Sequence, residues 1–79
     1  MKNYTFLGRS NGKRFCIDGI DVFENKWLSL GECDIVFDPV DKKPYSFSVY
    51  KIETPAKSIV FTAGRFSDET WGFFQVAQE

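Results

Sequence analysis

The sequence predicts a small all-β domain, a barrel or sandwich of five to seven short antiparallel strands. Fourteen of its 79 residues are aromatic, nine of them Phe, and they lie with β-branched residues in short apolar runs. Gly, Pro, Asn and Asp separate these runs at intervals of about ten residues, which is typical of small barrels and sandwiches. A chain of this length is expected to form one domain, residues 1–79.

The C-terminal half carries the strongest pattern, three apolar runs joined by two short polar turns. The runs cover residues 45–52, 58–66 and 70–76, and Pro55 and Asp68 lie in the turns between them. Aromatic and β-branched residues dominate each run, whereas turn-forming residues interrupt them. We therefore expect a three-stranded antiparallel meander.

The first of these runs has large side chains on both faces. Tyr45, Phe47 and Val49 share one face, whereas Tyr50 and Ile52 fall on the other. A one-residue slip in pairing would turn the wrong face to the core. Two structures would bury the large side chains of both parts of this run: a bulge near residues 49–50, or a strand that is covered on both faces.

The middle run is the expected central strand. Its residues 59–61 are three successive large apolar residues, which predicts burial on both faces. Gly64 interrupts this run. A glycine there indicates either a bulge or close backbone approach, or else space for a ligand.

Hairpin turns and further strands are predicted before the meander. Residues 3–7 form a candidate strand, and the Asn-Gly pair at 11–12 favours a turn that leads into a partner strand over 14–17. The Asp-Gly pair at 18–19 repeats the same turn signal. Another strand is expected at 32–37, followed by a polar loop with two prolines.

The segment after the second turn fits two structures. It matches a strand over residues 20–23, or a short helix near 21–30 with Asp21 as its N-terminal cap. In both structures Trp27 and Leu30 are expected to point inward.

Charge is distributed unevenly along the chain. Residues 1–17 carry four basic residues and no acid, whereas residues 18–41 carry seven acids and one Lys. Asp34, Asp38 and Asp41 belong to this acidic segment, where we expect an acidic face that attracts a cationic partner. The alternative is that these acids pair with the basic N-terminus and only solubilise the surface.

The function that these patterns favour is protein binding. We expect Asp34, Asp38 and Asp41 to contact a partner, with Trp27 or Trp71 as an aromatic anchor, because aromatic centres with charged rims are common in interfaces. An inhibitor or an immunity-type protein would act in this way. The alternative is a small-molecule binder whose aromatic pocket takes a cationic or aromatic ligand.

The composition disfavours several other classes of function. The chain has no His, the commonest general base and metal ligand, and its two Cys do not complete a tetrahedral zinc site. Its glycines lack the spacing of phosphate-binding loops. We therefore expect no enzymatic activity, no cofactor and no metal. A sequence pI of about 5.4 argues against nucleic acid, so a single-stranded nucleic-acid binder ranks last.

Location and assembly follow from the apolar residues. No apolar run exceeds three residues and no signal-peptide pattern is found, so we expect a cytoplasmic protein without membrane contact. In that compartment Cys16 and Cys33 are expected to be buried thiols, with a disulfide between them as the alternative. Fourteen aromatic residues exceed what one small core encloses, which favours self-association, in the simplest form a homodimer.

Overall fold

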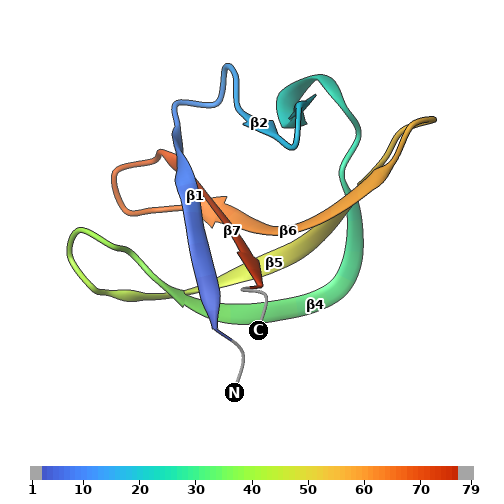
Figure 1. Ribbon diagram of the computed structural model, residues 1–79. Helices are drawn as coiled ribbons and strands as arrows, with labels where there is room; N and C mark the ends of the chain where they lie inside the picture. Colours follow the sequence, from blue (N-terminus) through green and yellow to red (C-terminus); the bar gives the residue numbers. More distant parts are fainter. Residues whose placement is uncertain (1–2, 77–79) are drawn as a thin grey trace.

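The computed structural model describes residues 3–76 and shows an all-β protein, which confirms the predicted class (Figure 1). The described chain contains a five-stranded antiparallel sheet and a two-stranded sheet. The large sheet is built from β1 (Tyr4–Ser10), β4 (Leu28–Phe37), β5 (Pro44–Glu53), β6 (Ser58–Arg65) and β7 (Trp71–Val76). The small elements are β2 (Cys16–Ile17), β3 (Ile20–Asp21) and the 3-10 helix η1 (Val22–Glu24).

The strand order of the large sheet is β1-β7-β6-β5-β4. The predicted meander of β5, β6 and β7 is confirmed, and β6 is the central strand as expected. The turn between β6 and β7 is held by Asp68, whose Oδ1 accepts hydrogen bonds from the hydroxyl of Thr70 at 2.6 Å and from its backbone N–H at 3.1 Å. These bonds, the hydroxyl bond first, lower the pKa of the Asp68 carboxyl below its ordinary value.

The first strand pairs with the last one, so the predicted hairpin between residues 3–7 and 14–17 is wrong. The ladder joins Tyr4 to Val76 and Ser10 to Trp71. β7 has buried residues on both faces, and β1 covers its otherwise open edge. This long-range pairing prevails over the local turn signal at 11–12, where the chain only bends.

The second predicted hairpin is confirmed, and the strand expected over residues 20–23 is present in part, as β3 over residues 20–21, whereas the alternative helix near 21–30 is wrong. β2 and β3 pair across the two-residue turn Asp18-Gly19, whose φ angles of 51° and 79° are both positive. Only a single 3-10 turn follows, capped by Asp21, whose Oδ1 accepts a hydrogen bond from the N–H of Phe23 at 3.0 Å. A longer helix is precluded because the chain is already paired with β5 from Leu28 onward.

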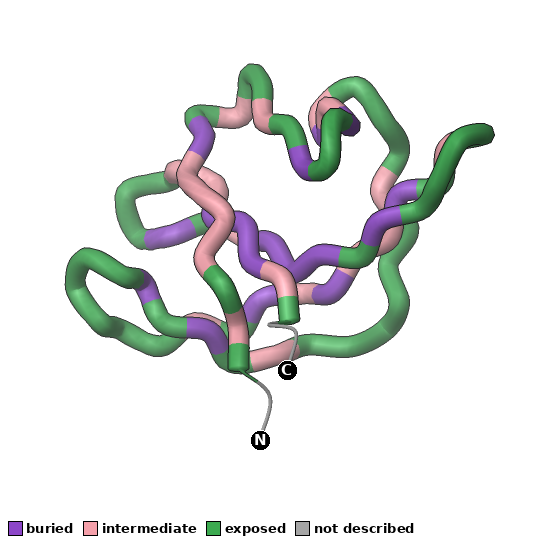
Figure 2. Tube along the Cα trace, in the orientation of Figure 1, coloured by how far each residue is buried: buried purple, intermediate pink, exposed green. Residues whose placement is uncertain are grey.

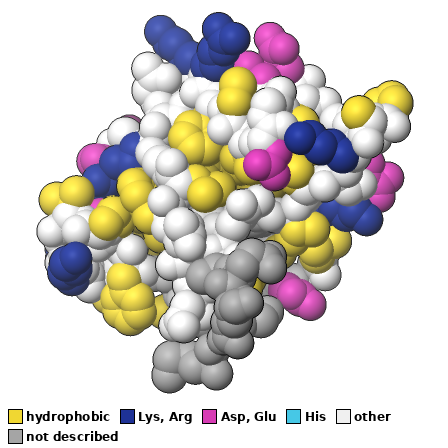
Figure 3. Space-filling view, in the orientation of Figure 1, with side chains coloured by type: hydrophobic (Ala, Val, Ile, Leu, Met, Phe, Trp, Pro, Cys, Tyr) yellow, Lys and Arg dark blue, Asp and Glu magenta, His cyan; other side chains and the backbone are white. Residues whose placement is uncertain are grey.

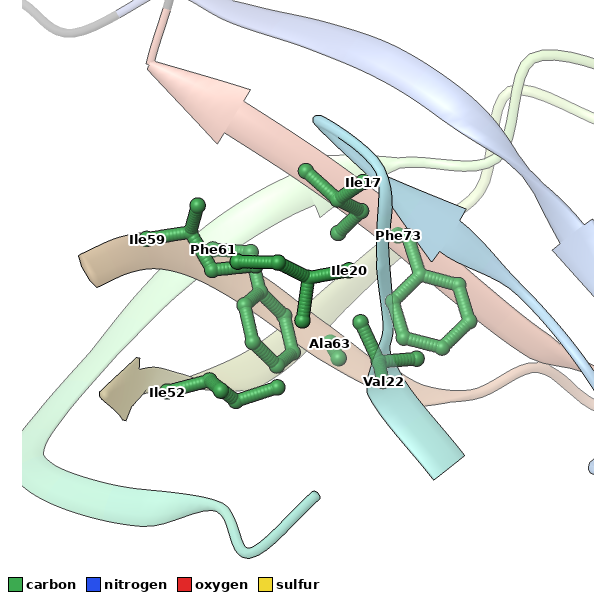
Figure 4. Close-up of a cluster of buried hydrophobic side chains, with 8 residues drawn as sticks. All are labelled: Ile17, Ile20, Val22, Ile52, Ile59, Phe61, Ala63 and Phe73. Atoms are coloured by element: carbon green, nitrogen blue, oxygen red, sulfur yellow. The ribbon is translucent and has the colours of Figure 1, made fainter. Parts of the chain in front are cut away.

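One apolar cluster lies between the small elements and one face of the large sheet (Figure 4). The ring of Phe15 stacks on that of Phe73 with centroids 4.4 Å apart, and Phe73 is fully buried. The hairpin and η1 thus cover this face and remove it from water. The buried members are Ile17, Ile20, Val22, Ile52, Ile59, Phe61, Ala63 and Phe73.

A second apolar cluster lies on the opposite face and consists of buried side chains of β4, β5, β7 and the turn after β6, namely Val36, Phe47, Phe66 and Phe74. Gly64 of β6 pairs directly with Gly72 of β7. A Cβ atom at Gly64 would overlap the ring of Phe47, and one at Gly72 would overlap the ring of Phe66. The close backbone approach predicted for Gly64 is therefore confirmed.

β5 is covered on both faces, as one of the two sequence interpretations required. Phe47 and Val49 are buried on the face of the second cluster, and Ile52 is buried in the first. The ladder with β6 runs without a break from Ser48 to Glu53, so this side of β5 carries no bulge.

The irregularity opposite residue 49 lies in β4 instead. The ladder between β4 and β5 is interrupted between Ser29 and Cys33, and Gly31 within this gap has a φ of 74°. In Figure 1 the green ribbon of β4 curves strongly along its length. Leu30 is 43% exposed in this bend, so the prediction that it points inward is wrong.

β1 and β4 are the two edges of the large sheet, and no ladder joins them within residues 3–76. A partly buried ion pair connects them at one end: a guanidinium nitrogen of Arg9 lies 2.5 Å from Oδ2 of Asp38, which follows β4 directly. The same guanidinium lies over the ring of Phe66, 4.3 Å from its centroid. The finer expectation of a barrel or sandwich stays a prediction.

Exposed residues lie mainly in the loops and at the outer rim of the sheet, whereas buried residues lie mainly along the central strands (Figure 2). Cys16 and Cys33 are both exposed free thiols, so neither the buried nor the disulfide-bonded state is found. The radius of gyration is 12.1 Å, as expected for a compact chain of this size. Residues 3–76 contain no helix with the length and apolar character needed to cross a membrane.

Candidate functional site

A cleft of about 450 Å³ lies beside the bend of β4 and brings together polar groups from distant parts of the chain. Its acidic residues are Asp18 of the β2–β3 turn and Glu32 and Asp34 of β4, and Tyr4 of β1 adds a phenol. Thr62 of the central strand is buried at its base. We call this feature the acidic cleft.

Strand pairing explains how the sequence assembles these groups. Glu32 and Asp34 are two residues apart on β4 and therefore share one face of the strand. The pairing of Tyr4 with Val76 places the start of β1 beside the end of β7, at the same end of the sheet. Asp18 takes a positive φ in a tight turn, a conformation that Asp tolerates better than most residues.

Within the part of the chain that the structure describes, no cation balances the negative charge of the acidic cleft. No Lys or Arg lines it among the residues that the structure describes. The ion pairs found in residues 3–76 use other acids, namely Asp38, Asp21 and Glu53. Three carboxyl groups without a cationic partner among the described residues create a negative potential that attracts cations.

Tyr4 Oη and Asp34 Oδ2 are both removed from solvent in the acidic cleft, and the phenol lies within hydrogen-bond reach of the Asp34 carboxyl and of Thr62. Burial, followed by a hydrogen bond to the Asp34 carboxyl, raises the pKa of Tyr4 from 10.0 to about 12. The phenol keeps its proton at neutral pH and can donate it to that carboxyl.

The rim of the acidic cleft is apolar. Leu30, Val60 and Val76 line it and are 43%, 47% and 49% exposed. Figure 3 shows such exposed hydrophobic side chains between scattered charges of both signs on one side of the molecule. A cleft of this kind offers apolar contact area around a negative interior.

The two tryptophans form a separate, shallower hollow of about 310 Å³ with residues 22, 23 and 25. The rings of Trp27 and Trp71 meet edge to face, with centroids 5.2 Å apart and an interplanar angle of 78°. Nε1 of Trp27 donates a hydrogen bond to the carbonyl oxygen of Val22 at 2.5 Å. Both side chains are half-buried, so much of their surface packs within the fold.

The five residues predicted to contact a partner are thus divided among four places. Asp34 lines the acidic cleft, and Trp27 and Trp71 meet in the hollow. Asp38 is 3% exposed and paired with Arg9. Asp41 is exposed in the β4–β5 turn, where its Oδ1 accepts a hydrogen bond from the N–H of residue 43 at 2.9 Å.

Sequence reasoning missed three residues of the acidic cleft. The spacing of Glu32 and Asp34 does place both on one strand face, which was the available signal for Glu32. Tyr4 and Asp18 join them only through long-range packing, for which the local sequence carries no signal.

A third depression is apolar and follows the seam between β1 and β4. It has a volume of about 520 Å³, and Phe6, Ile35, Phe37 and Phe74 are among its lining residues. Ile35 and Phe37 are each 58% exposed on the edge strand β4. An exposed apolar edge of this kind favours pairing with another chain.

The described residues contain no group of three or more His, Cys, Asp or Glu side chains close enough to hold a metal ion. The acids of the cleft are therefore spread along its walls. Comparison with protein-family models, with curated protein sequences and with solved structures finds no match to this chain.

Proposed function

We propose that this protein is a non-catalytic binding module that recognises a basic surface of another protein through the acidic cleft. The observation that carries the proposal is the set of carboxyl groups at Asp18, Glu32 and Asp34, which come from two separate segments, line one concave site and have no cationic partner among residues 3–76. Such a site accelerates encounter with a cationic partner and selects against anionic ones. An inhibitor or immunity-type protein is the class of module that we favour.

The apolar rim supports a protein partner in particular. Interfaces combine apolar contact area with a few charged groups that fix orientation. Leu30, Val60 and Val76 supply that area around the acids. The proposal replaces the single face expected from the sequence by a site in which Asp34 acts together with Glu32 and Tyr4.

A small cationic or aromatic ligand is the second candidate. The volume of the acidic cleft, about 450 Å³, lies within the range of roughly 300–1,000 Å³ that is common for small-molecule sites. A cationic ligand would fit the acidic cleft, whereas an aromatic ligand would fit the hollow of Trp27 and Trp71 and change their fluorescence.

Affinity capture with matched variants tests the proposal. The wild-type chain, the double variant Glu32→Gln/Asp34→Asn and the control Glu24→Gln/Asp41→Asn are immobilised and exposed to lysate of the source cell at two salt concentrations. Both variants lose two negative charges, but only the first changes the cleft. We expect a stoichiometric basic partner to be retained by wild type and control, lost from the first variant and weakened by salt. Equal retention by all three would refute the proposal.

Self-association and a cytoplasmic location are parts of the same proposal. Ile35 and Phe37 are exposed on the edge strand β4, and they support self-association in the form of a homodimer. The two exposed free thiols, Cys16 and Cys33, fit a reducing compartment. Sedimentation of the wild-type chain and of Phe37→Ser tests self-association. A wild-type chain that sediments as a monomer, as the variant does, would contradict it.

A further inference from the structure

Aromatic surface is accessible in the hollow of Trp27 and Trp71, which shares no lining residue with the acidic cleft. The ring of Phe23 completes its wall, with its centroid 5.8 Å from that of Trp27 and 6.2 Å from that of Trp71. All three side chains are half-buried, so part of each ring faces solvent. Aromatic rings in a concave site take either a cation or another flat ring.

A basic border decides between these two kinds of ligand. The guanidinium of Arg65 already lies over the ring of Trp71, with Cζ 5.3 Å from the ring centroid. A Cβ atom at Gly12 would lie 3.6 Å from the indole of Trp71. Lys13 and Arg14 follow Gly12 in the same loop, and both are exposed. Figure 3 shows Lys and Arg side chains next to each other at the top of the molecule, over the loop between β1 and β2. This border repels a cation and attracts an anion.

Arg14 continues the basic border to η1. Its Nε lies 3.7 Å from Oδ2 of Asp21, and residues 22 and 23, which follow directly, line the hollow. The Arg14 side chain is 81% exposed, so most of its guanidinium remains available to a ligand. Asp21 is engaged in the fold, because its Oδ1 caps η1 by accepting a hydrogen bond from the N–H of Phe23. Glu24 is the exposed acid of η1 and offsets part of the positive charge.

The low pI of the whole chain does not exclude an anion at this hollow. Asp18, Glu32 and Asp34 lie in the acidic cleft, and Asp38 is paired with Arg9. Salt screens exposed charges that are more than about 8 Å apart, so the nearest charges set the potential at each site. The hollow therefore favours a flat ring that carries negative charge.

A nucleobase attached to phosphate combines these two properties. Bases stack on aromatic side chains and on guanidinium planes, and Lys and Arg neutralise the neighbouring phosphates. Arg65 and Trp71 present both kinds of stacking surface together. The amide of Asn25, exposed on the wall of the hollow, adds a group that can hydrogen-bond the edge of a base. The cations come from two segments, β6 and the β1–β2 loop, which suits a strand with more than one phosphate.

We propose that the hollow of Trp27 and Trp71 binds one nucleobase of a single-stranded nucleic acid, with Lys13, Arg14 and Arg65 on the phosphates beside it. A free nucleotide offers the same chemistry with fewer phosphate contacts. This inference goes beyond the proposed function, because it assigns a second ligand of opposite charge to a site that is separate from the acidic cleft.

Tryptophan fluorescence tests the inference directly, because both tryptophans of the chain line the hollow. The probes are an octamer of deoxythymidylate, an octamer of the same backbone without bases, thymidine monophosphate and uncharged thymidine. We expect the deoxythymidylate octamer to quench the fluorescence and to bind at least about fivefold more tightly than the abasic octamer, because only the former stacks. With three phosphates neutralised, its affinity should fall about twentyfold between about 50 and 200 mM salt.

Substitutions at the border assign the phosphate contacts. Lys13→Gln/Arg14→Gln is expected to weaken binding of the octamer at least about fivefold and to reduce its dependence on salt. Lys43→Gln/Lys57→Gln is the matched control: it removes the same charge from exposed residues of turns that contribute nothing to the hollow, and should leave the affinity within about twofold of wild type. Glu24→Gln removes the opposing charge and should tighten binding.

Trp71→Leu tests the stacking surface and should weaken binding at least about fivefold. Far-ultraviolet circular dichroism reports whether this variant is folded; if it is not, the variants at Lys13 and Arg14, which are exposed, still decide the outcome.

Three results would overturn the inference. The first is equal binding of the two octamers, and the second is an equal loss of affinity in Lys13→Gln/Arg14→Gln and its control, since both would indicate only general attraction of a polyanion. The third is thymidine monophosphate bound as tightly as the octamer, which would replace the nucleic acid by a free nucleotide. Glu32→Gln/Asp34→Asn should bind the octamer at least as tightly as wild type, so failure here leaves the proposed function of the acidic cleft untouched.

Discussion

Replacement of Asp38 by Ala tests whether this residue stabilises the fold rather than contacts a partner. The Asp38 side chain is 4% exposed and bonds Arg9 at 2.5 Å, and its Oδ1 accepts a second hydrogen bond from the N–H of Val40 at 2.9 Å. Removing one member of a fully buried ion pair costs about 3–5 kcal/mol because the other charge is left uncompensated. Arg9 is 28% exposed, so water solvates part of its charge and the expected loss is about 2–3 kcal/mol.

A loss of this size is readily measured in a chain of 79 residues. We expect Asp38→Ala to lower the free energy of unfolding in urea by about 2–3 kcal/mol and the Tm by about 10–20 °C. Asp41→Ala is the matched control: it removes an exposed carboxylate in the same turn and should cost less than about 1 kcal/mol. A free energy of unfolding for Asp38→Ala within about 0.5 kcal/mol of wild type would show that the ion pair between the two sheet edges contributes little.

Three further changes probe other parts of the structure. The raised pKa of Tyr4 means that its contribution to stability is intact below pH 10 and is lost as the pH rises toward 12. Urea unfolding at both ends of this range should show a larger loss in wild type than in Tyr4→Phe, because the other groups that titrate there are common to both chains. The tyrosinate absorbance of the variant should also lack a step near pH 12, and equal losses in the two chains would contradict the raised pKa. Gly72→Ala should lower the unfolding free energy by about 2–3 kcal/mol because its Cβ overlaps the ring of Phe66, and an unchanged urea midpoint would contradict that overlap. Trp27→Phe should cost about 1–3 kcal/mol in thermal unfolding because it leaves the carbonyl oxygen of Val22 without its indole donor; a wild-type Tm would argue that water replaces the bond.

The parts of the fold that follow from the sequence are those fixed by neighbouring residues. The meander is predicted correctly because each of its strands pairs with the next one along the chain through a short turn. The Asp-Gly turn at 18–19 is equally local. The pairing of β1 with β7 joins residues 61 to 72 positions apart, from Ser10–Trp71 to Tyr4–Val76, and no periodicity within either strand encodes it.

The residues of the candidate site are also only partly predictable from local sequence. Asp34 could be selected from its charge and strand position, but a similar argument selected Asp38, which pairs with Arg9 of β1. The sequence does contain the opposite charges that make this pair, and the alternative of pairing with the basic N-terminus describes Asp38 correctly. Which acid is paired and which remains available depends on the path of β4 through its bend at Gly31.

The facing glycines of β6 and β7 also constrain how this sequence can change over generations. Gly64 and Gly72 leave bare backbone on which the rings of Phe47 and Phe66 rest. A mutation that adds a methyl group at Gly64 is harmful while Phe47 is present, and becomes acceptable only after that ring has been replaced by a smaller side chain. The reverse order first opens a cavity, which is also destabilising. Each glycine and its ring are therefore expected to be inherited as a pair, and divergent relatives of this protein should differ at both positions or at neither.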